Sequence, residues 1–70
     1  MENFSNRLKK CRKEAGLVQE DAARELDIRL STYNRYERGL SEPDISLAAK
    51  IADYFDVSLD YLAGRTDKER

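Results

Sequence analysis

The segment from residue 30 to residue 38 limits most strongly what this chain can fold into. On a helix, Tyr33 and Tyr36 fall on one side as an i,i+3 pair suited to a protein core. The opposite side holds a hydroxyl, an amide and two guanidinium groups without a carboxylate among them, from Ser31, Asn34, Arg35 and Arg38. Such a helix needs a scaffold beneath the tyrosines and a hydrogen-bonding partner in front of the polar side chains.

A shorter helix is predicted directly before it, from Gln19 to Leu26, with a tight connection over residues 26–29. Two packed helices with such an outward face are typical of a helix-turn-helix, in which the second helix enters the major groove of DNA. The side-chain types on residues 30–38 are those that hydrogen-bond base edges and phosphate oxygens.

The segment GLVQEDAARELDIRLSTYNRYERG resembles the helix-turn-helix of the lambda-repressor-like, Cro/repressor-type regulators (the Xre group) of bacteria and phages. The resemblance continues through EPDISLAAKIADYFDVSLDYLAGRTD and covers about residues 4–67. Its marks are Gln19 opening the first helix of the motif, Ala23 within it, ST-x-x-RYERG across the second and VSLDYLAG near the end. Each mark alone is weak, but together they are highly specific.

The fold class follows from helix-forming composition and the absence of strand-like alternation, which together favour an all-α single domain. The resemblance implies a compact five-helix DNA-binding domain with helices 2 and 3 as the helix-turn-helix. We expect this domain over residues 1–65 and a flexible tail over residues 66–70. The helices are expected at about residues 4–15, 19–26, 30–38, 45–55 and 59–63.

Apolar stripes indicate the core of each longer helix. In the first helix the stripe is Phe4, Leu8, Cys11 and Ala15, and in the second it is Ala22, Ala23 and Leu26. In the fourth helix it is Ile45, Ala48, Ala49, Ala52 and Phe55, with Leu47 and Tyr54 facing the other way. Cys11 lies within its stripe, so we interpret it as a small buried hydrophobe.

Several classes of function are disfavoured by composition. A single Cys excludes an internal disulfide, and without His there is no ordinary zinc site and no metal or other cofactor is expected. No Gly-rich phosphate loop or catalytic cluster is present, so we do not expect an enzyme. No segment is long and apolar enough to cross a membrane and no secretory signal is seen, which predicts a cytoplasmic protein.

The charge is unevenly distributed although the net charge is only −1. Residues 1–40 hold nine Lys and Arg against seven Asp and Glu, whereas residues 41–70 hold four against seven. Residues 7–13 include five basic residues and no acidic one. This pattern predicts one face for phosphate and an acidic rear, with tight binding only as a dimer and strong weakening by salt.

The predicted DNA contacts divide into base-reading and phosphate-binding residues. The expected base contacts are Leu30, Ser31, Asn34 and Arg35, and the expected phosphate contacts are Gln19, Arg29, Arg38, Lys9 and Lys13. Asn34 is equally suited to a phosphate, and Leu30 either touches a thymine methyl group or packs beside the preceding helix. Lys9 and Lys13, together with Lys10, either lie beside the DNA backbone or form an ordinary solvated face.

Two further sets of residues are implied by the resemblance alone. Arg12 and Glu37 match positions that form a partly buried ion pair between the first helix and the reading helix. The matching two-fold contact uses the start of helix 4 and helix 5, which gives Leu47, Leu59 and Tyr61 as candidates for a homodimer interface. Double-stranded DNA is the implied partner, on a roughly palindromic operator, with transcriptional repression as the usual outcome.

Some positions depart from the family pattern and support an alternative. Val18 and Arg29 stand where Ser or Thr caps a helix, and Asp27 and Asp56 stand where Gly is common. Leu40 replaces a basic residue. The acidic pI of about 5.4, the apolar Leu30 and Leu40 and the two uncapped helices leave open a protein-interaction module of the same fold, which binds a regulatory protein partner and has weak or lost DNA binding.

Overall fold

A computed structural model describes residues 2–70, and in that range it contains helices and no strand. The helices are α1 (Glu2–Glu14), α2 (Gln19–Glu25), α3 (Leu30–Glu37), α4 (Ile45–Phe55) and α5 (Leu59–Leu62). The predicted all-α fold with five helices is confirmed, and no helix end differs by more than two residues from its expected position.

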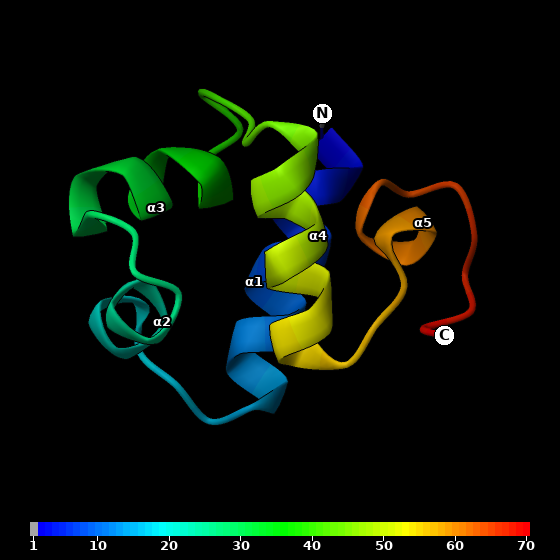
Figure 1. Cartoon of the computed structure of the whole chain (residues 1–70), viewed down its shortest axis with the longest axis horizontal. Coiled ribbons are helices and arrows are strands. Elements are labelled where there is room, and N and C mark those ends of the chain that lie inside the picture. The colour runs from blue at the N-terminus through cyan, green and yellow to red at the C-terminus, as the bar shows by residue number, and fades with distance from the viewer. Residues whose placement is uncertain (1) are drawn as a thin grey trace.

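The reading helix and the C-terminal helix lie on opposite sides of the molecule (Figure 1). α2 and α3 lie together on one side, α1 and α4 run through the middle, and α5 and the C-terminus lie on the other side. α3 packs against α1 and α2, whereas α5 packs against α1 and α4. α1 therefore packs against helices on both sides.

One hydrophobic core joins all five helices. The buried tyrosines of α3 are in its centre, since Tyr33 is 0% and Tyr36 7% exposed. The other buried hydrophobic residues are Phe4, Leu8, Cys11, Ala22, Ala23, Leu26, Ile51, Ala52, Tyr61 and Leu62. The inward direction predicted for both tyrosines is confirmed, and the small side chains of α2 leave room for α3 to approach closely.

The predicted apolar stripe of α4 was partly wrong. Ile45 is 75% exposed, and Ile51, which the prediction omitted, is fully buried. The inward face follows i, i+3, i+4 and i+7 from Ala48 to Phe55, so Ile45 in the first turn projects beyond it. Leu47, predicted to face away, is instead partly buried against the core.

The stripe of α1 also ends earlier than predicted. Ala15 is exposed because α1 ends at Glu14 and the chain reverses at the next glycine. There the amide of Leu17 donates to the Arg12 carbonyl at 3.2 Å, and that of Gly16 donates to the Lys13 carbonyl at 3.0 Å. These two hydrogen bonds define a Schellman motif.

The same reversal ends the other four helices, with two aspartates in the left-handed conformation. Asp27 has a φ of 57° and Asp56 a φ of 58°, at the ends of α2 and α4. The corresponding residues after α3 and α5 are glycines. At Gly64 a side chain would also clash, because an added Cβ would lie 2.4 Å from the Cβ of Asn3 on α1.

The first turns of α4 and α5 are capped by a side chain, whereas those of α2 and α3 are not. Asp44 accepts a hydrogen bond from the Leu47 amide, and Ser58 accepts one from the Tyr61 amide, both at 2.9 Å. These predicted caps of α4 and α5 are confirmed. Val18 and Arg29 form no side-chain cap with any described residue, so α2 and α3 begin without one.

The last residues lie against α1 and α5. Arg7 donates to the Tyr61 carbonyl at 3.0 Å and to the Thr66 carbonyl at 2.9 Å, and it pairs with Asp67 at 3.1 Å. Its guanidinium carbon lies 4.1 Å from the centre of the Tyr61 ring, a cation–π contact. The flexibility expected for residues 66–70 stays a prediction.

Candidate nucleic-acid interface

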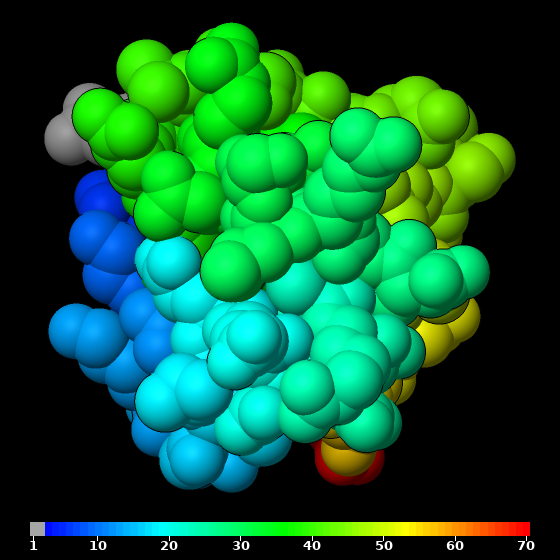
Figure 2. Space-filling view, turned by 90° about the vertical axis from the view of Figure 1, so that its left-hand side faces the viewer, coloured from blue at the N-terminus to red at the C-terminus, as the bar shows by residue number. Residues whose placement is uncertain are grey.

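α2 and α3 form one continuous face of the molecule. Figure 2 shows α3 (green) above α2 (cyan), with α1 (blue) and α4 (yellow) at the two edges. The candidate base contacts on α3 lie on its outward side: Ser31 and Arg35 are exposed, Leu30 is 45% exposed and Asn34 is half-buried. The structure therefore brings these four residues together on one helix surface.

Arg35 is held only weakly. One of its terminal nitrogens donates to the Leu40 carbonyl at 3.4 Å, a long and exposed hydrogen bond. Such a contact is easily exchanged for a base or a phosphate, so the guanidinium group is available to a ligand in front of α3.

The candidate phosphate contacts come from three helices. Arg29 and Arg38 are exposed at the two ends of α3, and Lys9 and Lys13 are exposed four residues apart on α1. Gln19 is half-buried, because its side chain takes part in a hydrogen-bond network beneath the face.

That network is built around an ion pair. Arg12 Nε donates to Glu37 Oε2 at 2.7 Å, and Arg12 Nη2 donates to Glu37 Oε1 at 3.1 Å. The Glu37 side chain is 1% and the Arg12 side chain 13% exposed. A further Arg12 nitrogen donates to the Leu17 carbonyl at 2.9 Å. Arg12 and Glu37 thus form the ion pair implied by the family resemblance, and it joins α1, α3 and the segment before α2.

The charges of the pair stabilise each other. Burial by itself raises the pKa of Glu37, but the interactions of its carboxylate with Arg12, Tyr33 and Gln19 outweigh burial and leave this pKa below its ordinary value. The hydrogen bond to Glu37 raises the pKa of Arg12. Glu37 is therefore an ionised carboxylate inside the domain.

The network continues from the ion pair to the surface of α3. Gln19 Nε2 donates to Glu37 Oε1 at 3.0 Å, and Asn34 Nδ2 donates to Gln19 Oε1 at 3.1 Å. The sequence indicated all three residues but not the hydrogen bonds that join them. The only available signal was the position of Gln19 at the start of α2, a helix expected to pack on α3.

The Tyr33 hydroxyl lies at the buried end of this network. It has no hydrogen-bond partner among the described residues, although it interacts electrostatically with Glu37. Burial and the neighbouring carboxylate raise the pKa of Tyr33. The hydroxyl therefore stays protonated.

Not all of the basic run of α1 faces outward. Besides Arg12, Arg7 binds the C-terminal segment, and Lys10 donates to the Tyr61 hydroxyl at 3.2 Å. Lys9 and Lys13 remain as the exposed cations of residues 7–13 whose side chains form no hydrogen bond or ion pair within the described chain.

The expected dimer surface needs a correction at Tyr61. This residue is 2% exposed beneath Arg7 and Lys10, so its side chain is not available to a second copy. Leu47 and Leu59 are partly exposed. Tyr61 is therefore better described as a core residue of the monomer.

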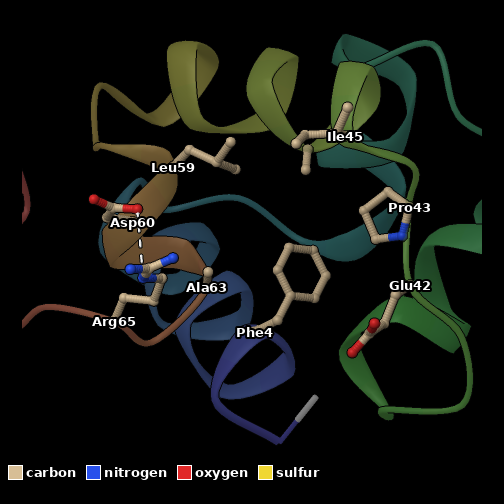
Figure 3. A pocket seen from close by; sticks show the side chains of 9 residues that line it. Phe4, Glu42, Pro43, Ile45, Leu59, Asp60, Ala63 and Arg65 are labelled. Carbon is tan, nitrogen blue, oxygen red and sulfur yellow. Dashed lines mark ion pairs between the residues drawn. The ribbon is translucent and has the colours of Figure 1, made fainter.

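Leu59 lines an apolar groove between the start of α4, α5 and the start of α1 (Figure 3). The groove has a volume of about 340 Å³. Its apolar lining is Phe4, Pro43, Ile45, Ala48, Leu59 and Ala63, and its charged rim is Glu42, Asp60 and Arg65. Ile45 and Leu59 point toward it from two helices.

A second hollow, of about 450 Å³, is lined in part by Cys11 and Tyr54. Cys11 is only 7% exposed, and burial raises the pKa of its thiol to about 11. The interpretation of Cys11 as a buried hydrophobe is confirmed, since such a thiol is protonated and unreactive near neutral pH.

Residues 2–70 contain no cluster of His, Cys, Asp and Glu that could hold a metal ion. Within the same range, every helix is too short or too polar to traverse a lipid bilayer.

Comparison with known proteins places this arrangement among regulators. The helix-turn-helix family model matches residues 8–62. The uncharacterised HTH-type transcriptional regulator YqaE of Bacillus subtilis is 43% identical over 96% of this chain and 58% of its own length. The HTH-type transcriptional regulator ImmR of the same organism is 35% identical over 93% of this chain and 51% of its own length.

A phage protein belongs to the same group of relatives. The cryptic phage CTXphi transcriptional repressor RstR of Vibrio cholerae is 39% identical over 89% of this chain and 55% of its own length. The chain thus spans little more than half the length of these three relatives. No solved structure matches it.

Proposed function

The chain belongs to the lambda-repressor-like helix-turn-helix family of transcriptional regulators, and from that premise we propose that it is a sequence-specific DNA-binding regulator that reads the major groove with α3. Repression is the expected direction of control, because RstR is named a transcriptional repressor. The regulator acts in the cytoplasm, where it meets double-stranded DNA.

The observation that carries this proposal is the division of α3 into two sides. Tyr33, Tyr36 and Glu37 are buried and hold the helix on α1 and α2. Ser31 and Arg35 are exposed on the outward side of α3. A short, firmly seated helix with an exposed guanidinium group matches the geometry by which this motif docks in a major groove.

We also propose that two copies bind together on a roughly palindromic operator. The groove of Figure 3 offers Ile45 of α4 and Leu59 of α5 to the second copy. Exposed apolar surface of this kind is typical of protein contacts. The modest number of outward cations favours pairing as well, because one protomer alone makes few phosphate contacts.

Fluorescence anisotropy with duplex DNA tests the proposal. At about 50 mM salt, where phosphate attraction is strong, the protein should bind a mixed-sequence duplex, and selection from a random pool should enrich a preferred site. Arg35→Ala should reduce the preference for that site by about 1–3 kcal/mol if Arg35 binds a guanine bidentately. Arg70→Ala is the matched control: it removes the same charge at the C-terminus, on the side opposite α3 (Figure 1), and should leave the preference unchanged.

The second candidate function is a protein-interaction module of the same fold. It is favoured by the exposed apolar side chains beside the reading face, Leu30 at 45% and Leu40 at 51% exposure. The absence of any DNA binding at about 50 mM salt would support this module and contradict the regulator.

A further inference from the structure

The network beneath the reading face has a fixed hydrogen-bond direction. We call its three members, Glu37, Gln19 and Asn34, the amide relay. An ionised carboxylate accepts hydrogen bonds and donates none. Glu37 is 3% exposed and lies against Arg12, which keeps it ionised, so its partner Gln19 must turn its NH₂ group toward it.

Because Glu37 fixes which end of the Gln19 amide faces it, Glu37 also fixes which end of that amide faces Asn34. With its Nε2 turned toward Glu37, Gln19 presents its Oε1 to Asn34, and the Nδ2 of Asn34 donates to that oxygen at 3.1 Å. Asn34 therefore keeps two groups for an outside partner, the Oδ1 acceptor and one N–H donor. In the opposite direction the Asn34 oxygen would face Gln19, and Asn34 would turn two N–H donors toward an outside partner.

The two orientations of the Asn34 amide complement different hydrogen-bonding groups of DNA. In the major groove adenine presents a donor at N6 beside an acceptor at N7, which complements one acceptor and one donor. Guanine presents two acceptors at O6 and N7, and phosphate oxygens also only accept. An Asn34 with its oxygen outward thus fits adenine and leaves that oxygen unpaired against guanine or phosphate.

We infer that Glu37 is a positioning residue which, through Gln19, orients the Asn34 amide to read adenine rather than guanine or a phosphate. The inference rests on the proposed function, in that α3 faces DNA. It assigns Asn34 to base reading, which the residue type alone leaves open. It also gives Glu37 a role in specificity although this side chain does not reach the surface.

Site selection from a random duplex pool tests the relay. Comparison of the wild type with Asn34→Ala identifies the base pair that Asn34 contacts. There the wild type should prefer adenine over guanine by roughly 5- to 150-fold, the range of one bidentate contact. Gln19→Met, which is similar in size and leaves the Arg12–Glu37 pair intact, should reduce the preference at that pair to about twofold or less. Retention of the wild-type preference by Gln19→Met would overturn the inference.

Two further variants separate the effect of the hydrogen-bond direction from the effects of lost stability and of a removed negative charge. Glu37→Gln can donate as well as accept, so it should weaken the adenine preference even where circular dichroism shows a folded domain. Glu20→Gln removes the same charge from an exposed position on α2, and it should raise affinity slightly without changing the preference. If Glu37→Gln does not fold, Gln19→Met alone decides.

A measurement without DNA distinguishes failure of the relay from failure of the proposed function. In nitrogen-15 NMR spectra of the free protein, one side-chain N–H of Asn34 should be shifted and slow to exchange with water, and Gln19→Met should abolish this difference. Two equally solvent-exposed Asn34 protons in the wild type would overturn the relay. A relay present in the free protein without sequence preference in DNA binding would instead refute the assignment of α3 as a base reader.

Discussion

At the scale of single residues, the structure concentrates its buried charge at Arg12 and Glu37. The Arg12 guanidinium group donates two hydrogen bonds to the carboxylate and one to the Leu17 carbonyl. Removing either partner leaves the other charge inside the domain without compensation. This pair is therefore expected to affect folding more than any surface ion pair of the described chain.

Arg12→Met should lower the free energy of unfolding by about 3–5 kcal/mol, because it leaves the Glu37 carboxylate buried without its main partner. Urea denaturation followed by circular dichroism measures this loss. Arg24→Met is the control, since Arg24 pairs with Asp21 at the surface, where such a pair contributes about 1 kcal/mol or less. Equal losses in the two variants would show that burial of the Arg12 pair has no particular importance.

The lowered pKa of Glu37 makes stability depend on pH in a definite direction. Because the folded-state pKa lies below the unfolded value, Glu37 contributes its full stabilisation above the unfolded pKa, and the contribution is lost as the pH falls through the folded pKa. Urea titrations between pH 7 and pH 3 should therefore show falling stability below an ordinary Glu pKa of about 4.3. In Glu37→Gln the part of the stability loss at low pH that comes from protonation of Glu37 should be missing. A pH profile of stability equal to that of the wild type would contradict the lowered pKa of Glu37.

At the scale of the helices, α2 and α3 lack the side-chain caps that α4 and α5 have. Val18 is 60% exposed and has an extended backbone, φ −84° and ψ 165°, which is the conformation of a capping residue. Only the oxygen of a Ser, Thr, Asp or Asn side chain is absent at this position.

Val18→Ser should therefore raise the free energy of unfolding, by about 1 kcal/mol, by supplying an acceptor for the free amides of the first turn of α2. Asp44→Ala is the complementary variant, because it removes the cap of α4 and should lower stability by a similar amount. Thermal unfolding of both variants beside the wild type is the measurement. A loss of stability in Val18→Ser would mean that contacts of the Val18 side chain outweigh the cap.

The sequence predicted the helices well because their signals are local. Apolar spacing, the caps Asp44 and Ser58 and the reversal at Gly16 depend on neighbouring residues alone. The error at Ile45 arose at the first turn of α4, where periodicity does not show whether a side chain still reaches the core.

The candidate site was predictable as a set of residues but not as a connected structure. The helical periodicity of residues 30–38 predicts which side of α3 faces outward, and the structure has Arg35 exposed and Tyr33 buried. The link from Gln19 to Asn34 depends on how α2 packs against α3, and the burial of Tyr61 depends on Arg7. Both contacts join segments far apart in sequence, which periodicity does not specify.

At the scale of the whole molecule, internal contacts reduce the positive charge available to DNA. Arg7, Lys10 and Arg12 bind within the domain. Four outward cations remain among the expected phosphate contacts: Lys9, Lys13, Arg29 and Arg38.

The logarithm of the binding constant should therefore fall with the logarithm of the salt concentration with a slope of about −3 to −4 per protomer, or twice that for a pair. Anisotropy titrations from about 50 to 200 mM salt measure this slope at known stoichiometry. Lys13→Ala should reduce the slope by about 1 in magnitude per protomer. A wild-type slope steeper than about −6 per protomer would mean that Arg7 and Lys10 leave Tyr61 to bind phosphates.

The position of α1 has a consequence for operator spacing. Near its end α1 holds α3 through Arg12, and near its start Phe4 lines the groove proposed for pairing. The 13 residues of α1 span about 20 Å as one straight rod. In a pair of copies this rod, rather than a bendable loop, sets how far apart the two reading helices stand. An inserted base pair would move the half-sites by about 3.4 Å and a tenth of a turn, and such an operator should be rejected rather than accommodated.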